Sequence, residues 1–205
     1  MSVEKKRIVV KVGSSTITYQ NGKANIRKIE RLARVMSDLH NSGHEMVLVS
    51  SGAIAVGVGR LELNVKPEST RMKQAAAAVG QCDLMFMYDK LFGEYNTPVA
   101  QILLTRDIVE DENRKENTEN TFAALIEMGV IPIVNENDTV STEEIFFGDN
   151  DHLSAIVAEL CSADLLIMVT DTDGLYDKDP RIDSSAKLIS HVEHITPEMR
   201  ECAGG

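Results

Sequence analysis

The sequence has no tryptophan, and aromatic residues make up only 4% of its 205 residues. Aliphatic side chains must therefore form most of the hydrophobic core, within an apolar share of 43%. No apolar run approaches the ~20 residues of a membrane-spanning helix, and the first residues lack the apolar segment of a signal peptide. We therefore expect a soluble, cytoplasmic protein with no membrane partner.

Basic residues are in deficit, because 21 Lys and Arg stand against 32 Asp and Glu, which gives a net charge of −11. A protein that follows a phosphate backbone needs a positively charged surface, and the sequence contains no basic cluster. We expect no nucleic-acid partner for this chain.

Cysteine is scarce as well. The three cysteines, Cys82, Cys161 and Cys202, are too far apart for a C-x-x-C motif and odd in number for a disulfide framework. This usage is typical of a reducing compartment. Cys161 ends an apolar helical stretch and is expected to be a small buried hydrophobic residue rather than a catalytic thiol.

Short aliphatic runs alternate with longer segments of helical character. The runs of strand length are 8–12, 45–49, 98–104, 130–134 and 165–169. The helical segments are 26–39, which Gly43 ends, and 70–92, 117–128 and 151–160. Strands that are apolar on both faces belong inside a parallel sheet covered by helices. The pattern predicts an α/β fold, a doubly wound and mainly parallel sheet with helices on both faces, forming one domain over residues 1–205.

Polar residues follow every predicted strand, at 11–16, 50–53, 105–107, 135–138 and 170–174. One polar strand end is explained by turn formation alone. Ligands of such sheets, however, bind outside the carboxyl ends of the strands. Five polar ends together favour a binding site along one edge of the sheet.

Lys11 is followed by Gly13 and Ser14, which places a positive charge beside a turn whose backbone N–H groups can bind phosphate. Taken alone, Lys11 equally fits a strand-end lysine that reaches solvent. The sequence contains neither a P-loop nor a G-x-G-x-x-G motif. Any nucleotide must therefore be held in another way.

The remaining polar segments have structural alternatives. The segment 50–57 lacks the G-x-S-x-G motif and histidine partner of a hydrolase, so neither a catalytic serine nor a catalytic histidine is predicted. Asn150 or Asp151, judged from their own segment, fits the N-cap of the helix that follows. The Asp-rich stretch 171–181 lacks the closing Glu of an EF-hand calcium loop.

Taken together, these segments resemble the amino acid kinase family. The matching segments, in chain order, are 11–15, 49–55, 135–140, 147–151 and 170–176. The first and last are shared across that family, whereas 51–54, 135–140 and 148–151 resemble the branch that phosphorylates L-glutamate. The resemblance runs from residue 7 to near residue 200 and implies a three-layer α/β/α fold.

The resemblance implies transfer of the γ-phosphoryl group of ATP to the side-chain carboxylate of free L-glutamate, which gives glutamyl 5-phosphate for proline synthesis. A carboxylate is already ionised at neutral pH, so the reaction needs no general base. Catalysis then consists of positioning and charge neutralisation. Magnesium is expected on the ATP phosphates rather than in a metal site of the protein.

Roles for individual residues also follow from the resemblance. Lys11 is implied to stabilise the transferred phosphoryl group, with Asp151 orienting Lys11 by charge pairing. The implied ATP-binding residues are Lys11, Gly13, Ser14, Thr170 and Asp171. The implied glutamate-binding residues are Ser51, Gly52, Asp138 and Asn150, and the carboxylate of Asp138 suits the substrate's ammonium group.

The family pattern continues with a later glycine-rich loop and often a PUA domain, which 1–205 is expected to lack. The chain is then the glutamate-binding part of the domain plus the start of the ATP-binding part. A homo-oligomer and functional coupling to glutamyl phosphate reductase are expected from the family. The alternatives are another amino acid kinase acting on acetylglutamate or aspartate, a non-catalytic amino acid sensor, and a purely structural α/β module.

Overall fold

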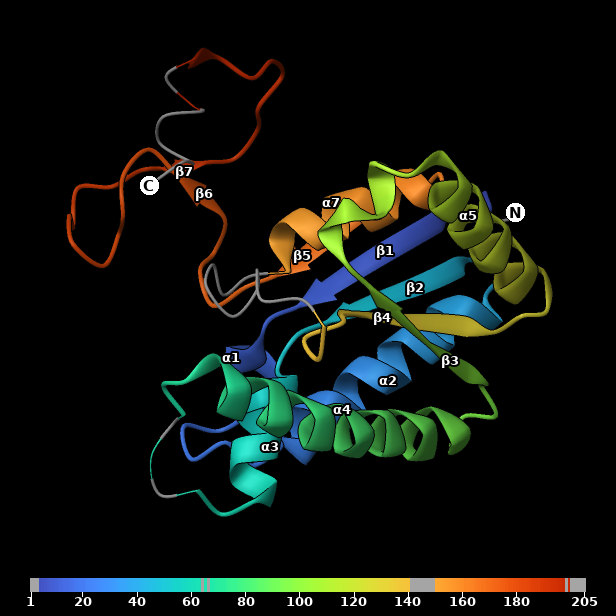
Figure 1. Ribbon diagram of the computed structural model, residues 1–205. Helices are drawn as coiled ribbons and strands as arrows, with labels where there is room; N and C mark the ends of the chain where they lie inside the picture. The colour runs from blue at the N-terminus through green and yellow to red at the C-terminus, as the bar shows by residue number, and fades with distance from the viewer. Residues whose placement is uncertain (1–3, 64, 66, 141–149, 198, 200–205) are drawn as a thin grey trace. The chain divides into compact units, whose positions relative to one another are not determined.

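A computed structural model describes residues 4–63, 65, 67–140, 150–197 and 199 (Figure 1). Its internal contacts divide the chain into two units, Met1–Val169 and Thr170–Gly205. The first unit holds a five-stranded sheet and all the long helices. No helix among the described residues is long and apolar enough to cross a membrane.

The sheet of the first unit is entirely parallel, as the apolar runs predict. Its strands run in the spatial order β3-β4-β2-β1-β5. They are β1 (Arg7–Val12), β2 (Glu45–Ser50), β3 (Val99–Leu104), β4 (Ile131–Glu136) and β5 (Leu165–Val169). Each predicted strand is confirmed to within one or two residues. The carboxyl ends of all five strands therefore meet at one edge.

Helices cover both faces of the sheet, which confirms the doubly wound architecture (Figure 1). The helices on one face are α2 (Ile26–Asn41), α3 (Ala53–Arg60) and α4 (Thr70–Gly93), and those on the other are α5 (Glu112–Glu127) and α7 (Asp151–Leu160). Val10 packs into the first core and Val9 into the second, because successive side chains of a strand point to opposite faces.

Two helices differ from the sequence-based expectation. Helix α5 begins at residue 112 rather than 117, with Asp111 at its N-cap accepting hydrogen bonds from the backbone of Asn113 (3.0 Å) and Arg114 (3.1 Å). Its first turns are exposed and carry no apolar periodicity. Helix α3 was not predicted at all, because its segment is short and rich in glycine.

Glycine allows α3 and α4 to pack closely. A Cβ atom added to Gly57 would lie 1.8 Å from the carbonyl oxygen of Ala76, and one added to Gly80 would lie 1.8 Å from that of Ala53. No larger residue fits at either position without separating the helices. This packing fixes the start of α3, and with it the loop that leaves β2.

Strand β5 departs from the expectation of an enclosed strand. Among the described residues it lies at the edge of the sheet, and Leu165, Ile167 and Met168 are 45%, 39% and 44% exposed. Cys161, just before it, is buried as predicted, and burial raises the pKa of its thiol to about 11. Such a thiol stays protonated and unreactive at neutral pH.

The second unit consists mostly of turns and bends. Its regular structure is an antiparallel pair formed by β6 (Leu175–Tyr176) and β7 (Leu188–Ile189). Hydrogen bonds from the backbone of Asp177 to Lys187 (3.1 Å) and from the backbone of Lys187 to the carboxylate of Asp177 (2.7 Å) extend this pairing. Residues 148 and 149 of the glutamate-branch motif, residue 147 before them and Cys202 lie outside the described residues.

Candidate active site

Lys11 lies at the carboxyl end of β1 and forms an ion pair with Asp151. The lysine is buried, with 7% of its surface exposed, and the aspartate lies in the first turn of α7. Gly13 follows in the turn after β1, and a Cβ atom there would lie 3.7 Å from the lysine Nζ. The lack of a side chain at this position leaves the turn's backbone open beside a fixed positive charge.

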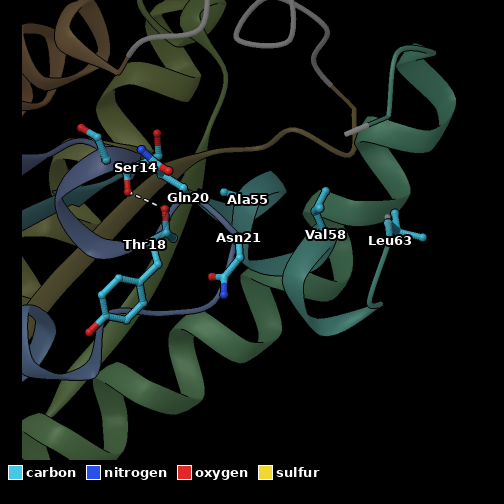
Figure 2. A pocket seen from close by; sticks show the side chains of 10 residues that line it. Ser14, Thr18, Gln20, Asn21, Ala55, Val58 and Leu63 are labelled. Carbon is cyan, nitrogen blue, oxygen red and sulfur yellow. Dashed lines mark hydrogen bonds between the residues drawn. The ribbon is translucent and has the colours of Figure 1, made fainter. Parts of the chain in front are cut away.

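A cavity of about 650 Å³ opens next to this turn (Figure 2). Ser14 and Ser15 line it from the short helix α1 (Ser14–Ile17), and Ala55 and Val58 line it from α3. The hydroxyl of Thr18 donates a hydrogen bond to the carbonyl of Ser14 (2.8 Å), which holds the turn in place. The cavity is lined by hydroxyl, amide and apolar groups, so it suits an uncharged part of a ligand.

The loop after β2 is tied to its neighbours on both sides. The backbone N–H of Ser51 donates to the carbonyl of Val12 (3.1 Å), and the hydroxyl of Ser50 pairs with that of Tyr88 on α4 (2.8 Å). Burial raises the pKa of Tyr88 to about 12, so this phenol stays neutral. Gly52 has φ +101°, a conformation that glycine adopts without strain.

Two buried carboxylates lie at the end of β4. Glu136 is the last residue of the strand and Asp138 lies in the loop that follows, and they are 2% and 5% exposed. The pKa of Asp138 is raised to about 7, first by its burial and then by the negative charge of Glu136. The amide of Asn135 donates to Gln81 on α4 (2.8 Å), which fastens the end of β4 to that helix.

Asn150 joins the ends of β2 and β4. Its side chain is fully buried, and its Nδ2 donates to the carbonyl of Ser50 (3.1 Å) and to Oδ1 of Asn135 (2.7 Å). It occupies the N-cap position of α7, yet its side chain makes no capping hydrogen bond. The expected N-cap position is thus confirmed for Asn150, but its side chain does not cap the helix and instead bonds to the ends of β2 and β4.

Three buried oxygens around this bridge lack a hydrogen-bond partner among the described residues. They are Oγ of Ser51, Oδ1 of Asp138 and Oδ1 of Asn150. Leaving a buried acceptor unpaired costs about 1–3 kcal/mol, so three at one place indicate a site for a ligand that donates hydrogen bonds. They lie beside Lys11, since its partner Asp151 directly follows Asn150 in the chain.

Comparison with known proteins decides the family. Residues 6–204 match the model of the amino acid kinase family. The chain belongs to the amino acid kinase family. It is 60% identical to a glutamate 5-kinase of Clostridium perfringens, over 98% of this chain and 77% of the relative, and 54% identical to a glutamate 5-kinase of Listeria innocua, over 98% and 74%.

A solved structure supports the fold of this amino acid kinase. The crystal structure of an isopentenyl phosphate kinase substrate complex aligns with a TM-score of 0.59 at 19% identity, covering 90% of this chain and 77% of that one. An identity this low shows the shared fold alone. The resemblance predicted from the sequence motifs, and the fold it implied, are thus confirmed.

The structure brings together most of the predicted site residues of this amino acid kinase. Those of the first unit all lie at the carboxyl edge of the sheet: Lys11, Gly13, Ser14, Ser51, Gly52, Asp138, Asn150 and Asp151. Thr170 and Asp171 belong to the second unit. Both are exposed, and the Thr170 hydroxyl donates to the Asp171 carboxylate (3.4 Å). Among the described residues, no group of three or more His, Cys, Asp or Glu is placed to hold a metal ion.

Sequence reasoning missed the residues that support this site. Gln81 and Tyr88 contact it from α4, and Glu136 adds the second carboxylate. The two α4 residues are seven positions apart, which places both on one face of the helix. That spacing is the one signal that pointed to them.

Proposed function

We propose that this chain phosphorylates the side-chain carboxylate of L-glutamate with ATP and forms glutamyl 5-phosphate, the first step of proline biosynthesis. The observation that carries the proposal is the group of three unpaired acceptors on Ser51, Asp138 and Asn150 beside the Lys11–Asp151 ion pair. The glutamate 5-kinases of Clostridium perfringens and Listeria innocua, at 60% and 54% identity, support the same substrate.

The orientation of the Asn150 amide favours an amino acid as the ligand. Asn135 Oδ1 accepts from the backbone N–H of Glu136 (2.9 Å), which identifies it as an oxygen, so the Asn150 atom that faces it is the nitrogen. Both Asn150 N–H bonds are then used within the protein. Its oxygen remains to accept a hydrogen bond, and with Asp138 it suits a substrate ammonium group.

The chemistry needs little beyond charge placement. An oxygen of the substrate carboxylate forms a bond to the γ-phosphorus as the bond to the bridging oxygen of ADP breaks, and no proton has to move. Lys11 offsets the negative charge on the transferred phosphoryl group. Asp151 holds the lysine in place through their ion pair.

We assign the ATP phosphates to the turn after β1. Backbone N–H groups at Gly13 and Ser14 lie beside the Lys11 ammonium, and the absence of a Cβ at residue 13 allows close approach. We assign Thr170 and Asp171 to further contacts with the nucleotide. Magnesium bound to the ATP phosphates would supply Lewis-acid stabilisation of the developing charge.

We also infer a cytoplasmic homo-oligomer whose product passes to glutamyl phosphate reductase. Support for oligomers comes from an apolar stripe on α4 formed by Met72, Ala75, Val79, Cys82 and Phe86, spaced by three and four residues. Met72 is 41% exposed and Phe86 is 68% exposed. Exposed apolar stripes of this spacing suit helix pairing between copies.

The test is ADP release by this chain with ATP, magnesium and L-glutamate, with hydroxylamine added to trap the acyl phosphate as a hydroxamate. Lys11→Ala is expected to reduce the rate by at least about 100-fold, because it removes a charge that acts on the transition state. Lys90→Ala, at an exposed position of α4, serves as the matched control. Absence of glutamate-dependent ADP release from a folded protein that carries residues 1–205 together with the later glycine-rich loop of the family would refute the proposal.

A further inference from the structure

Two side chains of α4 hold the two residues to which Asn150 is bonded. The Nδ2 of Asn150 donates to the carbonyl of Ser50 (3.1 Å) and to Oδ1 of Asn135 (2.7 Å). The hydroxyl of Ser50 pairs with that of Tyr88 (2.8 Å). The Nδ2 of Asn135 donates to Oε1 of Gln81 (2.8 Å). Helix α4 therefore contacts both residues on which the position of the Asn150 amide depends.

The Asn135 side chain is held from two directions. It points to the same face of the sheet as Ile133, which packs into the core beneath α2, α3 and α4, and it is only 2% exposed. Its Oδ1 accepts from the backbone N–H of Glu136 (2.9 Å), which identifies this atom as the oxygen, and its Nδ2 donates to Gln81. Without Gln81, the buried Nδ2 loses that partner, which is unfavourable unless the side chain turns.

The direction of Asn150 Oδ1 follows from the two acceptors of Asn150 Nδ2. A side-chain amide is planar, so two hydrogen bonds from its nitrogen fix where its oxygen points. The Ser50 carbonyl belongs to the backbone of β2, whereas Asn135 Oδ1 moves with a side chain. Asn150 Oδ1 is buried and has no hydrogen-bond partner among the described residues. A turn of the Asn135 side chain would therefore redirect one of the three acceptors assigned to the substrate.

We propose that Gln81 is a positioning residue of the acceptor site, because it holds the Asn135 amide and thereby fixes the direction of Asn150 Oδ1. The inference rests on the proposed function and deepens it. The three amides form a chain from α4, on one face of the sheet, to the start of α7, on the other face. The two helix layers are joined at the site by this chain.

The experiment replaces Gln81 with methionine in a protein that carries residues 1–205 together with the later glycine-rich loop of the family. Methionine has a similar length and helix propensity but forms no comparable hydrogen bond to Asn135. The calorimetric affinity for L-glutamate is expected to fall at least about threefold, because a bond that orients the site is lost. Gln81→Ala should behave in the same way. Gln101→Met, at an exposed position of β3, is the matched control and should bind as the wild type does.

A double-mutant cycle separates positioning from a general loss of stability. If Gln81 acts through Asn150, Gln81→Met should have no further effect on affinity in the Asn150→Ala background. The KM for L-glutamate gives the same comparison where binding is too weak for calorimetry. A loss of affinity by the same factor in both backgrounds would overturn the inference, and so would equal binding by Gln81→Met and Gln101→Met. Either result leaves the proposed function intact.

The side-chain amide signals of Asn150 give a readout that needs no substrate. They are the pair missing from the proton–nitrogen correlation spectrum of Asn150→Ala. Gln81→Met is expected to shift them through the change at Asn135, and Gln101→Met is not. Unshifted signals in Gln81→Met would overturn the inference. If the wild type neither binds nor phosphorylates L-glutamate, the proposed function fails, and these signals alone decide whether Gln81 positions Asn150.

Discussion

Replacing Asn150 with alanine is predicted to lower both the free energy of unfolding and the affinity for L-glutamate. The side chain is fully buried and donates to the carbonyl of Ser50 (3.1 Å) and to Oδ1 of Asn135 (2.7 Å). These bonds connect β2 to β4 at the edge where the site lies. Their loss separates two loops that carry proposed substrate ligands.

The expected loss of stability follows from this bonding pattern. A buried hydrogen bond contributes about 0.5–1.5 kcal/mol net, and an acceptor left without a donor costs about 1–3 kcal/mol. Asn135 Oδ1 keeps the backbone N–H of Glu136, so the larger cost applies to the Ser50 carbonyl. The total is about 2–4 kcal/mol, which for a chain of this size corresponds to a drop in Tm of about 5–15 °C.

The assay is thermal and urea unfolding followed by circular dichroism, together with calorimetric titration of L-glutamate. Asn117→Ala is the matched control, because its exposed side chain makes one 3.3 Å hydrogen bond to Asn113 on the same helix. The control should change stability by no more than about 0.5 kcal/mol. If Asn150→Ala has the same unfolding free energy and the same affinity for L-glutamate as Asn117→Ala, the hydrogen bonds of Asn150 stabilise neither the fold nor the site. The reasoning is then refuted.

Two other consequences can be measured. Asp138→Asn is expected to raise Tm at about pH 8 and not at about pH 4. A carboxyl with a pKa of about 7 when folded, against an ordinary value of 3.8, destabilises the fold by an amount that grows as the pH rises above 3.8 and is complete above about 7. An equal gain at both pH values in a thermal-unfolding series would contradict this. Phe86→Glu on the apolar stripe of α4 is expected to reduce the proposed homo-oligomer to monomers in sedimentation velocity. Met128→Glu, at a 73% exposed apolar position outside that stripe, should not. The stripe is not the interface if both variants keep the wild-type mass.

The sequence alone was sufficient to predict the sheet and the edge that carries the site. Parallel strands buried on both faces are unbroken aliphatic runs, so β1, β2, β3 and β4 are visible without any knowledge of their neighbours. The polar residues after each strand identified the binding edge, because all carboxyl ends of a parallel sheet lie together. The motifs at those ends also indicated the family.

Helix boundaries were harder to predict from the sequence than strands. The first turns of α5, for example, are exposed to solvent and have no apolar pattern. Helix α3 was missed because Gly57 and its neighbours read as a loop. Residue 57 is a glycine because it packs against Ala76 on α4. A Cβ atom on residue 57 would lie 1.8 Å from the carbonyl oxygen of Ala76. Such a contact depends on the helix that packs against the segment and leaves no local signal.

Within the site, the sequence determined which residue types are present, and the tertiary structure decided their chemistry. Asn150 reads locally as a helix cap, and it became a bridge only because its partners Ser50 and Asn135 lie 100 and 15 residues away in the chain. Asp138 reads as an ordinary acid, and its pKa of about 7 results from its burial and from the position of Glu136. Burial and long-range contacts exist only in the folded chain, and they set the energy of every charge at this edge.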